Sequence, residues 1–180
     1  KKRLLREEVR LEELEKRKEN ILQRKKVLSD KLEVAVESKK VLQEIVSVVQ
    51  RRVYKSLIEG VNHCLQSVFA FPYDFDLEAK SRGGKVDTSF VFSKFGVDLG
   101  GMEELGGGVI DVVSFALRLS ILGLVGGRKI LILDEPFRFL SVEYREKVRE
   151  LLGRLSEKLG IQIIMITHFE DLACGNILRL

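Results

Sequence analysis

The sequence Ile130-Leu131-Ile132-Leu133-Asp134-Glu135-Pro136 decides the fold. Four aliphatic residues followed by two acids are typical of a parallel β-strand that is covered on both faces. A second apolar run, Ile161 to Thr167, ends in Thr167-His168. Between the two runs, Val142 to Leu159 has apolar residues at helical spacing, and Gly160 can cap that helix. This order predicts a right-handed βαβ unit and therefore an α/β fold.

The residues that end these two strands are candidates for phosphoryl-transfer chemistry. Ligands bind at the carboxyl ends of strands in open α/β sheets, where Asp134 and Glu135 stand. We expect Asp134 to hold a Mg²⁺ ion and Glu135 to act as the catalytic base that polarises an attacking water. His168 should lie beside them and contact a γ-phosphate or orient the water. The alternatives are a strand that simply ends in polar residues at the solvent, and a structural histidine.

A glycine run, Gly106-Gly107-Gly108, precedes the most apolar helix of the chain. Glycines let the backbone approach an anion closely, and a helix N-terminus presents free N–H groups, so a γ-phosphate could bind there. The alternative is a hinge. The helix that follows should be largely buried and should end at Gly126-Gly127. Arg118 lies on this helix and would then need a partner.

Residues 60–99 connect this region to the N-terminal part of the chain. Gly60 is the first possible break in the preceding helix, and Pro72 should end a short helix over residues 61–70. Residues 74–99 then favour strands, because Val86, Thr88, Phe90 and Phe92 alternate with polar residues. With a turn at residues 93–96, this pattern predicts a β-hairpin with one buried face.

Residues 1–59 contain neither Gly nor Pro and carry a heptad repeat that begins at Leu4. Six of the seven d positions are apolar, namely Leu14, Ile21, Leu28, Ala35, Leu42 and Val49, and the other is Glu7. Four of the seven a positions are apolar, namely Leu4, Leu11, Leu32 and Val46, and the other three are Lys18, Lys25 and Lys39. This repeat predicts a coiled-coil helix about 90 Å long. The three lysines weaken a symmetric dimer and favour an antiparallel partner helix; the alternative is an amphipathic helix that lies along its own domain.

Charge and cysteine content limit the remaining possibilities. Residues 1–59 hold 17 Lys/Arg against 11 Asp/Glu, so the basic excess lies entirely in this segment. It could favour DNA, or it could be a solvated helix surface. Two unclustered cysteines, Cys64 and Cys174, indicate a reducing compartment, so we expect a cytoplasmic or nucleoid-associated protein. We find no apolar run of about 18 residues and expect no membrane partner.

Together these residues resemble the C-terminal half of an ABC-superfamily ATPase head of the SMC/SbcC type. Leu105 to Gly108 lies where that family has the signature Leu-Ser-Gly-Gly, and Ile130 to Glu135 matches the Walker B strand. Leu140-Ser141 lies where Leu-Asp forms the D-loop, and Thr167-His168 matches the switch histidine. The G-x-x-x-x-G-K-[ST] phosphate loop, Walker A, is absent from the 180 residues.

The resemblance implies a two-part chain, with a coiled-coil helix over residues 1–59 and the C-terminal lobe of the head over residues 60–180. It implies ATP and Mg²⁺ as cofactors and half of an ATPase active site, which stays inactive without an N-terminal Walker A half. Two heads would sandwich ATP, with Gly106, Gly107, Gly108 and Ser141 acting on the nucleotide of the other head. The further partners it implies are an SbcD-type nuclease and DNA, in repair or recombination.

Two departures from the family pattern keep alternatives open. Gly106 replaces the signature serine, which removes a hydroxyl contact to the γ-phosphate, and Ser141 replaces the D-loop aspartate. Both substitutions favour a structural dimerisation module that no longer hydrolyses ATP, whereas an intact set of Asp134, Glu135 and His168 speaks against it. A third alternative is an SMC-like chromosome-organising protein without a nuclease partner.

Overall fold

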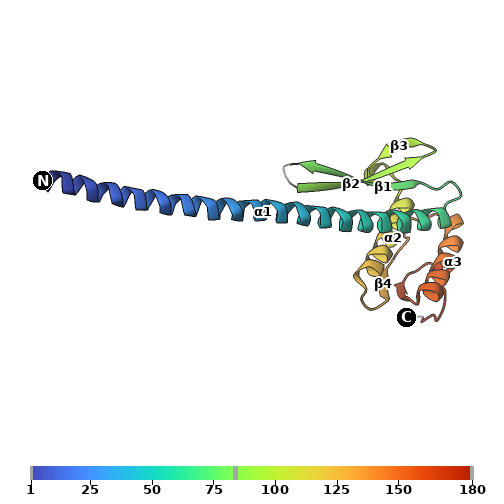
Figure 1. Ribbon diagram of the computed structural model, residues 1–180. Coiled ribbons are helices and arrows are strands. Elements are labelled where there is room, and N and C mark those ends of the chain that lie inside the picture. The colour runs from blue at the N-terminus through green and yellow to red at the C-terminus, as the bar shows by residue number, and fades with distance from the viewer. Residues whose placement is uncertain (1, 83–84, 179–180) are drawn as a thin grey trace. The chain divides into compact units, whose positions relative to one another are not determined.

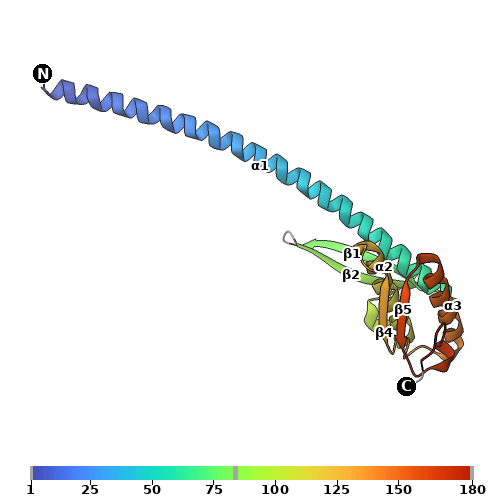
Figure 2. The ribbon, with the colours of Figure 1, turned by 90° about the horizontal axis from the view of Figure 1, so that it is seen from below.

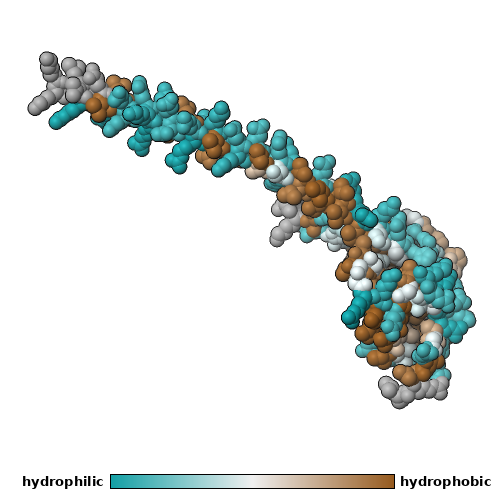
Figure 3. All heavy atoms as spheres, turned by 60° about the horizontal axis from the view of Figure 1, so that its bottom comes forward, coloured by the Kyte–Doolittle hydropathy of each residue, from teal (hydrophilic) through white to brown (hydrophobic). Residues whose placement is uncertain are grey.

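The computed structural model describes residues 2–82 and 85–178. The chain divides into two compact units, Lys1–Gln50 and Arg51–Leu180. Helix α1, Lys2–Val68, makes up the described part of the first unit and supplies the first element of the second. Its described apolar side chains in the first unit are exposed, among them Leu14, Leu28 and Leu32. Figure 3 shows apolar patches among polar ones along this helix.

Gly60 does not break α1, contrary to the expectation from the sequence, because the helix continues to Val68. The reason lies in the packing of the second unit. A Cβ atom at Gly60 would collide with the Oγ atom of Ser120 on helix α2 (Gly107–Val125). Gly60 therefore marks a close approach of α1 to α2, where a larger residue would require the Ser120 hydroxyl to rotate away.

Three antiparallel strands follow α1: β1 (Asp74–Arg82), β2 (Lys85–Lys94) and β3 (Val97–Gly100). The predicted single hairpin is thus a sheet of three strands in sequence order (Figure 1). Phe95 and Gly96 form the β2–β3 turn with φ values of 54° and 75°, the left-handed conformation that two-residue hairpin turns require. The short 3-10 helix η1, Met102–Glu104, leads from this sheet toward α2.

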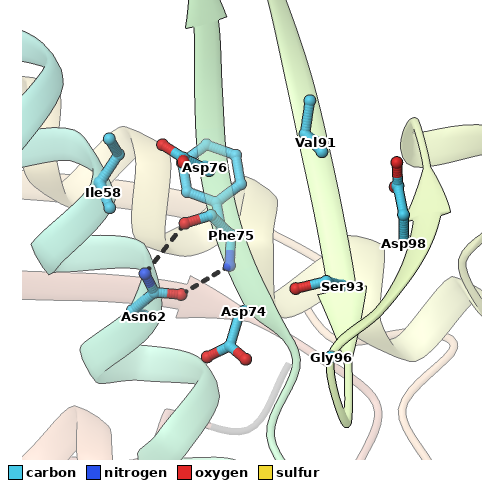
Figure 4. A pocket seen from close by; sticks show the side chains of 9 residues that line it. All are labelled: Ile58, Asn62, Asp74, Phe75, Asp76, Val91, Ser93, Gly96 and Asp98. Atoms are coloured by element: carbon cyan, nitrogen blue, oxygen red, sulfur yellow. Dashed lines mark hydrogen bonds between the residues drawn. The ribbon is translucent and has the colours of Figure 1, made fainter.

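The predicted buried face of this sheet is only partly buried. Phe75 and Phe92 are fully covered, whereas Val86 and Phe90 are exposed. At the buried end, the Asn62 side chain accepts a hydrogen bond from the backbone N–H of Phe75 and donates one to its carbonyl oxygen, over 2.8 and 3.0 Å (Figure 4). Asn62 thereby fixes the start of β1 against α1.

The second sheet is the predicted parallel pair, β4 (Ile130–Asp134) and β5 (Gln162–Ile166). Helix α3, Val142–Leu159, connects them, and Gly160 ends it in the left-handed conformation. Figure 2 shows β4 and β5 side by side. The short 3-10 helix η2, Glu170–Leu172, follows β5. The predicted α/β fold, with a parallel βαβ core, antiparallel strands and a long N-terminal helix, is confirmed.

One face of the β4–β5 sheet is open within the described residues, so the expected cover on both faces is wrong there. Leu131 and Leu133 are buried on one face. On the other face Ile132 is 70% exposed, Ile166 57% and Ile164 46%. Large aliphatic side chains on a parallel strand are normally covered, so this face is suited to packing against another protein segment.

Helix α2 is buried only along its first half, which corrects the expectation that it is largely buried. Val112, Val113 and Ala116 are fully covered, whereas Ile121 and Val125 are exposed. Arg118 is exposed too, so it needs no buried partner. By length and composition alone α2 could cross a membrane, which the sequence analysis did not anticipate. Its first half packs in the core of the second unit.

We expect the two cysteines to differ sharply in reactivity. Cys64 lies in the core, where burial raises the pKa of its thiol to about 12, while Cys174 is exposed. Because the thiolate is the reactive form, Ellman's reagent at pH 8 should titrate one thiol in the native protein and two in denaturant. Rapid reaction of two thiols in the native protein would contradict the packing around Cys64.

Candidate functional site

The candidate site lies where β4 and β5 end. The two strands stay paired to their last residues, since Asp134 is opposite Ile166. The backbone N–H of Glu135 donates a further hydrogen bond to the Ile166 carbonyl oxygen over 2.9 Å. Thr167 and His168 follow directly on β5. The parallel register therefore brings the ends of the two sequence motifs to the same edge of the sheet.

Glu135 and His168 are in direct contact at this edge. The Nδ1 atom of His168 lies 2.8 Å from the Oε2 atom of Glu135. Both side chains remain accessible, with 34% of the Glu135 side chain and 60% of the His168 side chain exposed. The expected proximity of His168 to Glu135 is confirmed, while the catalytic roles of the two residues stay predictions. A carboxylate paired with an imidazole that solvent can reach is able to hold and orient a water molecule.

The backbone beside this pair is strained. Glu135 has a φ of 42° and Phe137 a φ of 63°, a left-handed conformation that non-glycine residues seldom adopt. Such residues cost about 1–3 kcal/mol each and gather at functional sites. Phe137 is buried against Phe115, with ring centroids 5.3 Å apart. That packing holds the turn, and the turn sets the direction of the Glu135 side chain.

The three glycines differ in what surrounds them. A Cβ atom at Gly107 would lie 2.8 Å from the Cβ of Phe139, and one at Gly108 would lie 3.0 Å from the Phe139 carbonyl oxygen. A Cβ at Gly106 would meet nothing within 4 Å. Gly107 and Gly108 are therefore required for packing against the loop after β4. Gly106, the N-cap residue of α2, is the one with open space for a ligand.

This contrast gives a test by substitution. We expect Gly106→Ser to leave the melting temperature within about 2 °C of the parent, because its φ of −67° suits any residue and Ser and Gly differ little as N-caps. Gly107→Ser should lower the free energy of unfolding by roughly 1–3 kcal/mol, as overpacking does. Thermal denaturation measures the melting temperature and chemical denaturation the free energy of unfolding of both variants, and equal stability of the two would contradict the packing of Phe139.

Two residues of the site were missed by sequence reasoning. Asp111, on the first turns of α2, accepts a hydrogen bond from the backbone N–H of Phe139 over 2.8 Å. Arg145, on α3, donates to the Leu140 carbonyl oxygen over 3.3 Å and pairs with Asp171 over 3.2 Å. No local pattern marks either residue, because their partners lie up to 28 residues away in the chain.

Arg145 joins the segment before Ser141 to the segment after His168. Its guanidinium lies 3.7 Å from the ring centroid of Phe169, and that ring lies 3.9 Å from the His168 ring. Only 12% of the Arg145 side chain is exposed, whereas 50% of the Asp171 side chain is. Ser141 itself is the N-cap residue of α3, without a side-chain capping hydrogen bond, and its side chain is exposed to solvent.

The donor set at the strand ends fits Mg²⁺ held jointly with phosphate groups. Among the described residues no three His, Cys, Asp or Glu side chains are grouped to bind a metal by themselves. Mg²⁺ is commonly bound by one or two carboxylates together with nucleotide phosphates and water. Asp134 can supply one such carboxylate. Asp74, Asp76 and Asp98 line the hollow of Figure 4. Their carboxylates are likewise not grouped closely enough to bind a metal ion.

Comparison with curated proteins finds import ATP-binding proteins. The chain is 38% identical over 70 residues to the spermidine/putrescine import ATP-binding protein PotA of Mycoplasma capricolum, a match that covers 39% of this chain and 18% of the relative. It is 34% identical over 69 residues to the sulfate/thiosulfate import ATP-binding protein CysA of Pseudomonas aeruginosa, covering 38% and 20%. The matches thus span about a fifth of these relatives. No family model matches the chain.

Comparison with solved structures finds SMC heads. An Smc head domain with a coiled coil and joint from Pyrococcus yayanosii has a TM-score of 0.56 at 14% identity, over 80% of this chain and 29% of that chain. An SMC head bound to the C-winged helix domain of ScpA has a TM-score of 0.56 at 16% identity, over 70% and 38%. A structure from work on ATP-driven dimerization of SMC ATPases has 0.53 at 14%, over 69% and 74%. The fold is similar to that of part of an SMC head domain.

Proposed function

We propose that this chain is the C-terminal half of an ATP-hydrolysing head of the ABC and SMC type, which closes on a second head when ATP binds. The observation that carries the proposal is the contact between Glu135 and His168 at the ends of two adjacent parallel strands. The fold supports it, and so do the ATP-binding proteins among the sequence relatives.

In this proposal each residue at the strand ends has its own task. Asp134 contributes a carboxylate to a Mg²⁺ ion, which neutralises charge on the nucleotide phosphates when it is bound. Glu135 accepts a proton from the attacking water, and the strained turn directs its carboxylate toward the open edge. His168 orients that carboxylate by donating its Nδ1–H, and in its doubly protonated form it also has an Nε2–H to donate to a phosphate oxygen. Arg145 holds the segment that carries His168 in place.

The glycine segment would act on the nucleotide of the second head. At the N-terminus of α2, the free backbone N–H groups and the helix dipole favour a phosphate. Gly106 leaves open space but brings no hydroxyl, so backbone groups alone would make the contact. Ser141 would lie near the facing head in place of the family's aspartate. We therefore expect the ATP bound by the second head, which this glycine segment and Ser141 would contact, to be hydrolysed slowly.

The open face of the β4–β5 sheet supports the proposal that an N-terminal half completes the head. Ile132, Ile164 and Ile166 present a continuous apolar surface on parallel strands. An N-terminal lobe with a Walker A loop, on the same or a separate chain, would cover this face and complete the nucleotide site. The exposed second half of α2 is apolar as well and would join that interface.

A repair function, with an SbcD-type nuclease and DNA as partners, is the finer form of this proposal and comes from the motif resemblance. A chromosome-organising function is the second candidate, because two of the similar SMC heads are described with ScpA bound. Purification of the tagged protein from its native cells would distinguish the repair function from the chromosome-organising function. A co-purifying metal-dependent nuclease supports repair, whereas a ScpA-like subunit supports chromosome organisation.

The experiment that tests the proposal is ATP-driven association. The chain mixed with its Walker A half should double in mass by light scattering when ATP and Mg²⁺ are added, and ADP should not produce this change. A mass that is unaffected by ATP, although the nucleotide binds, would contradict head closure.

A further inference from the structure

The contact of His168 with Glu135 does not result from burial of the histidine ring. The His168 side chain is 60% exposed, and an ordered contact of 2.8 Å to the Glu135 carboxylate needs neighbours that restrict its rotamers. Phe169 lies against the His168 ring, with ring centroids 3.9 Å apart at an angle of 42°. The orientation of His168 therefore depends on what fixes the Phe169 ring.

Arg145 on helix α3 contacts the Phe169 ring. The guanidinium Cζ atom lies 3.7 Å from the ring centroid, a separation at which a cation is attracted to an aromatic ring. The Phe169 main chain is held separately, since its N–H donates to the Thr167 Oγ1 atom over 3.1 Å and its carbonyl oxygen accepts from the N–H of Leu172 over 3.2 Å. Leu172 is fully buried. The core thus anchors the main chain, and Arg145 positions the ring.

The same guanidinium group also binds the loop that precedes Ser141. Its Nε atom donates to the Leu140 carbonyl oxygen over 3.3 Å, while its terminal nitrogen pairs with Asp171 over 3.2 Å. The residue before Leu140 is Phe139, which packs against the glycine segment at the start of α2. One side chain therefore contacts both the loop of residues 137–141 and the segment of residues 167–172.

We propose that Arg145 is a positioning residue that couples this loop to His168. In the proposed function, on which this inference rests, the loop would lie near the second head. Its position there would set the orientation of the His168 ring and, through that ring, of the Glu135 carboxylate. Arg145 itself touches neither the nucleotide nor the attacking water.

A purely structural ion pair is the alternative role for Arg145. The carboxylate partner, Asp171, has a side chain that is 50% exposed, and ion pairs with solvent-exposed partners stabilise a protein by little. A lysine could make that pair equally well. Only the planar guanidinium, with its fixed set of donors, can stack on a ring while it binds a carbonyl and a carboxylate. Substitution by lysine therefore separates the two roles.

Nuclear magnetic resonance of the histidine ring protons tests the contact without nucleotide. The chain has two histidines, and His63→Gln assigns their signals. The ring current of Phe169 displaces the His168 signals from those of a free imidazole. We expect Arg145→Lys and Arg145→Leu both to move the His168 signals toward the free values, while the His63 signals stay in place. Arg154→Leu, at an exposed position of the same helix, is the control and should move neither.

A double-mutant cycle tests the coupling to the loop. Asp111→Ala removes the acceptor for the backbone N–H of Phe139 and thereby loosens the loop. We expect this change to move the His168 signals in the parent chain but not in the Arg145→Leu variant. A movement of equal size in both would mean that the loop does not act through Arg145, and would overturn the proposal.

Turnover by the head reconstituted with its Walker A half supplies the functional test. Arg145→Lys should lower kcat by roughly 10- to 100-fold, the cost of a misplaced catalytic group. The KM for ATP should stay within about twofold, because no contact to bound ATP is removed. Arg154→Leu should match the parent in both constants.

Two further results would contradict the positioning role. One is His168 signals that stay in place in both Arg145 variants, with only the free energy of unfolding lowered, as a structural ion pair would give. The other is displaced signals together with a kcat equal to that of the parent. A parent head without turnover would instead contradict the proposed function, and the two resonance experiments would then decide the role of Arg145 by themselves.

Discussion

Replacing Glu135 with glutamine is expected to lower the rate of ATP turnover by roughly 10²- to 10⁴-fold, the usual contribution of a general base. The rate in question is that of the head reconstituted from this chain and its Walker A half. Glutamine has the same shape and can still hydrogen-bond the His168 ring, but its amide cannot accept the proton of an attacking water. ATP binding and ATP-driven association should persist in this variant.

Steady-state phosphate release measures this effect, and light scattering with ATP measures association. Glu157→Gln is the matched control, because it makes the same change at an exposed position of α3 and should leave the rate unaltered. A Glu135→Gln head that turns over ATP at the parent rate would remove Glu135 from the mechanism. The strained turn at Glu135 and Phe137 would then need another explanation.

Placing lysine at both Ile132 and Ile164 is expected to weaken binding of the Walker A half by more than 100-fold. Burial of two unpaired ammonium groups in an apolar interface costs several kcal/mol. The lobe itself should stay folded, since exposed substitutions away from special features usually change stability by only about 0.5 kcal/mol. Isothermal titration calorimetry with the Walker A half measures the loss.

The double variant Val86→Lys/Val97→Lys serves as its control, because both valines are exposed on the antiparallel strands and not on the β4–β5 face. It should bind the Walker A half as the parent does. Unchanged affinity of the Ile132→Lys/Ile164→Lys variant would mean that this face is not the interface between the two halves. A similar loss in both double variants would indicate a general charge effect.

The βαβ core could be predicted from the sequence because its signals are local. Four aliphatics in a row specify β4, helical spacing specifies α3, and Gly160 specifies the end of that helix. The proximity of Glu135 to His168 follows from the same reasoning, since adjacent parallel strands end at the same edge. Such features need only the period of the pattern and the rules of chain connection.

Features that depend on contacts between distant segments could not be predicted. Gly60 looks like a helix break in the sequence, but α2 packs against it. Gly107 and Gly108 look like phosphate-binding residues, yet Phe139 gives them a packing role as well. The apolar run of β4 predicted cover on both faces, but one face is open in the described chain. An apolar run indicates that both faces of a strand suit burial, but it does not reveal which segment covers them.

The central claim, that this chain carries half of an ATP-hydrolysing site, is tested most directly by phosphate release from the two halves measured separately and together, with and without DNA. We predict that each half alone is inactive, that mixing restores turnover, and that DNA increases it. Turnover by this chain alone would contradict the division of the site. Absence of turnover in the mixture, with ATP still bound, would identify a structural dimerisation module instead.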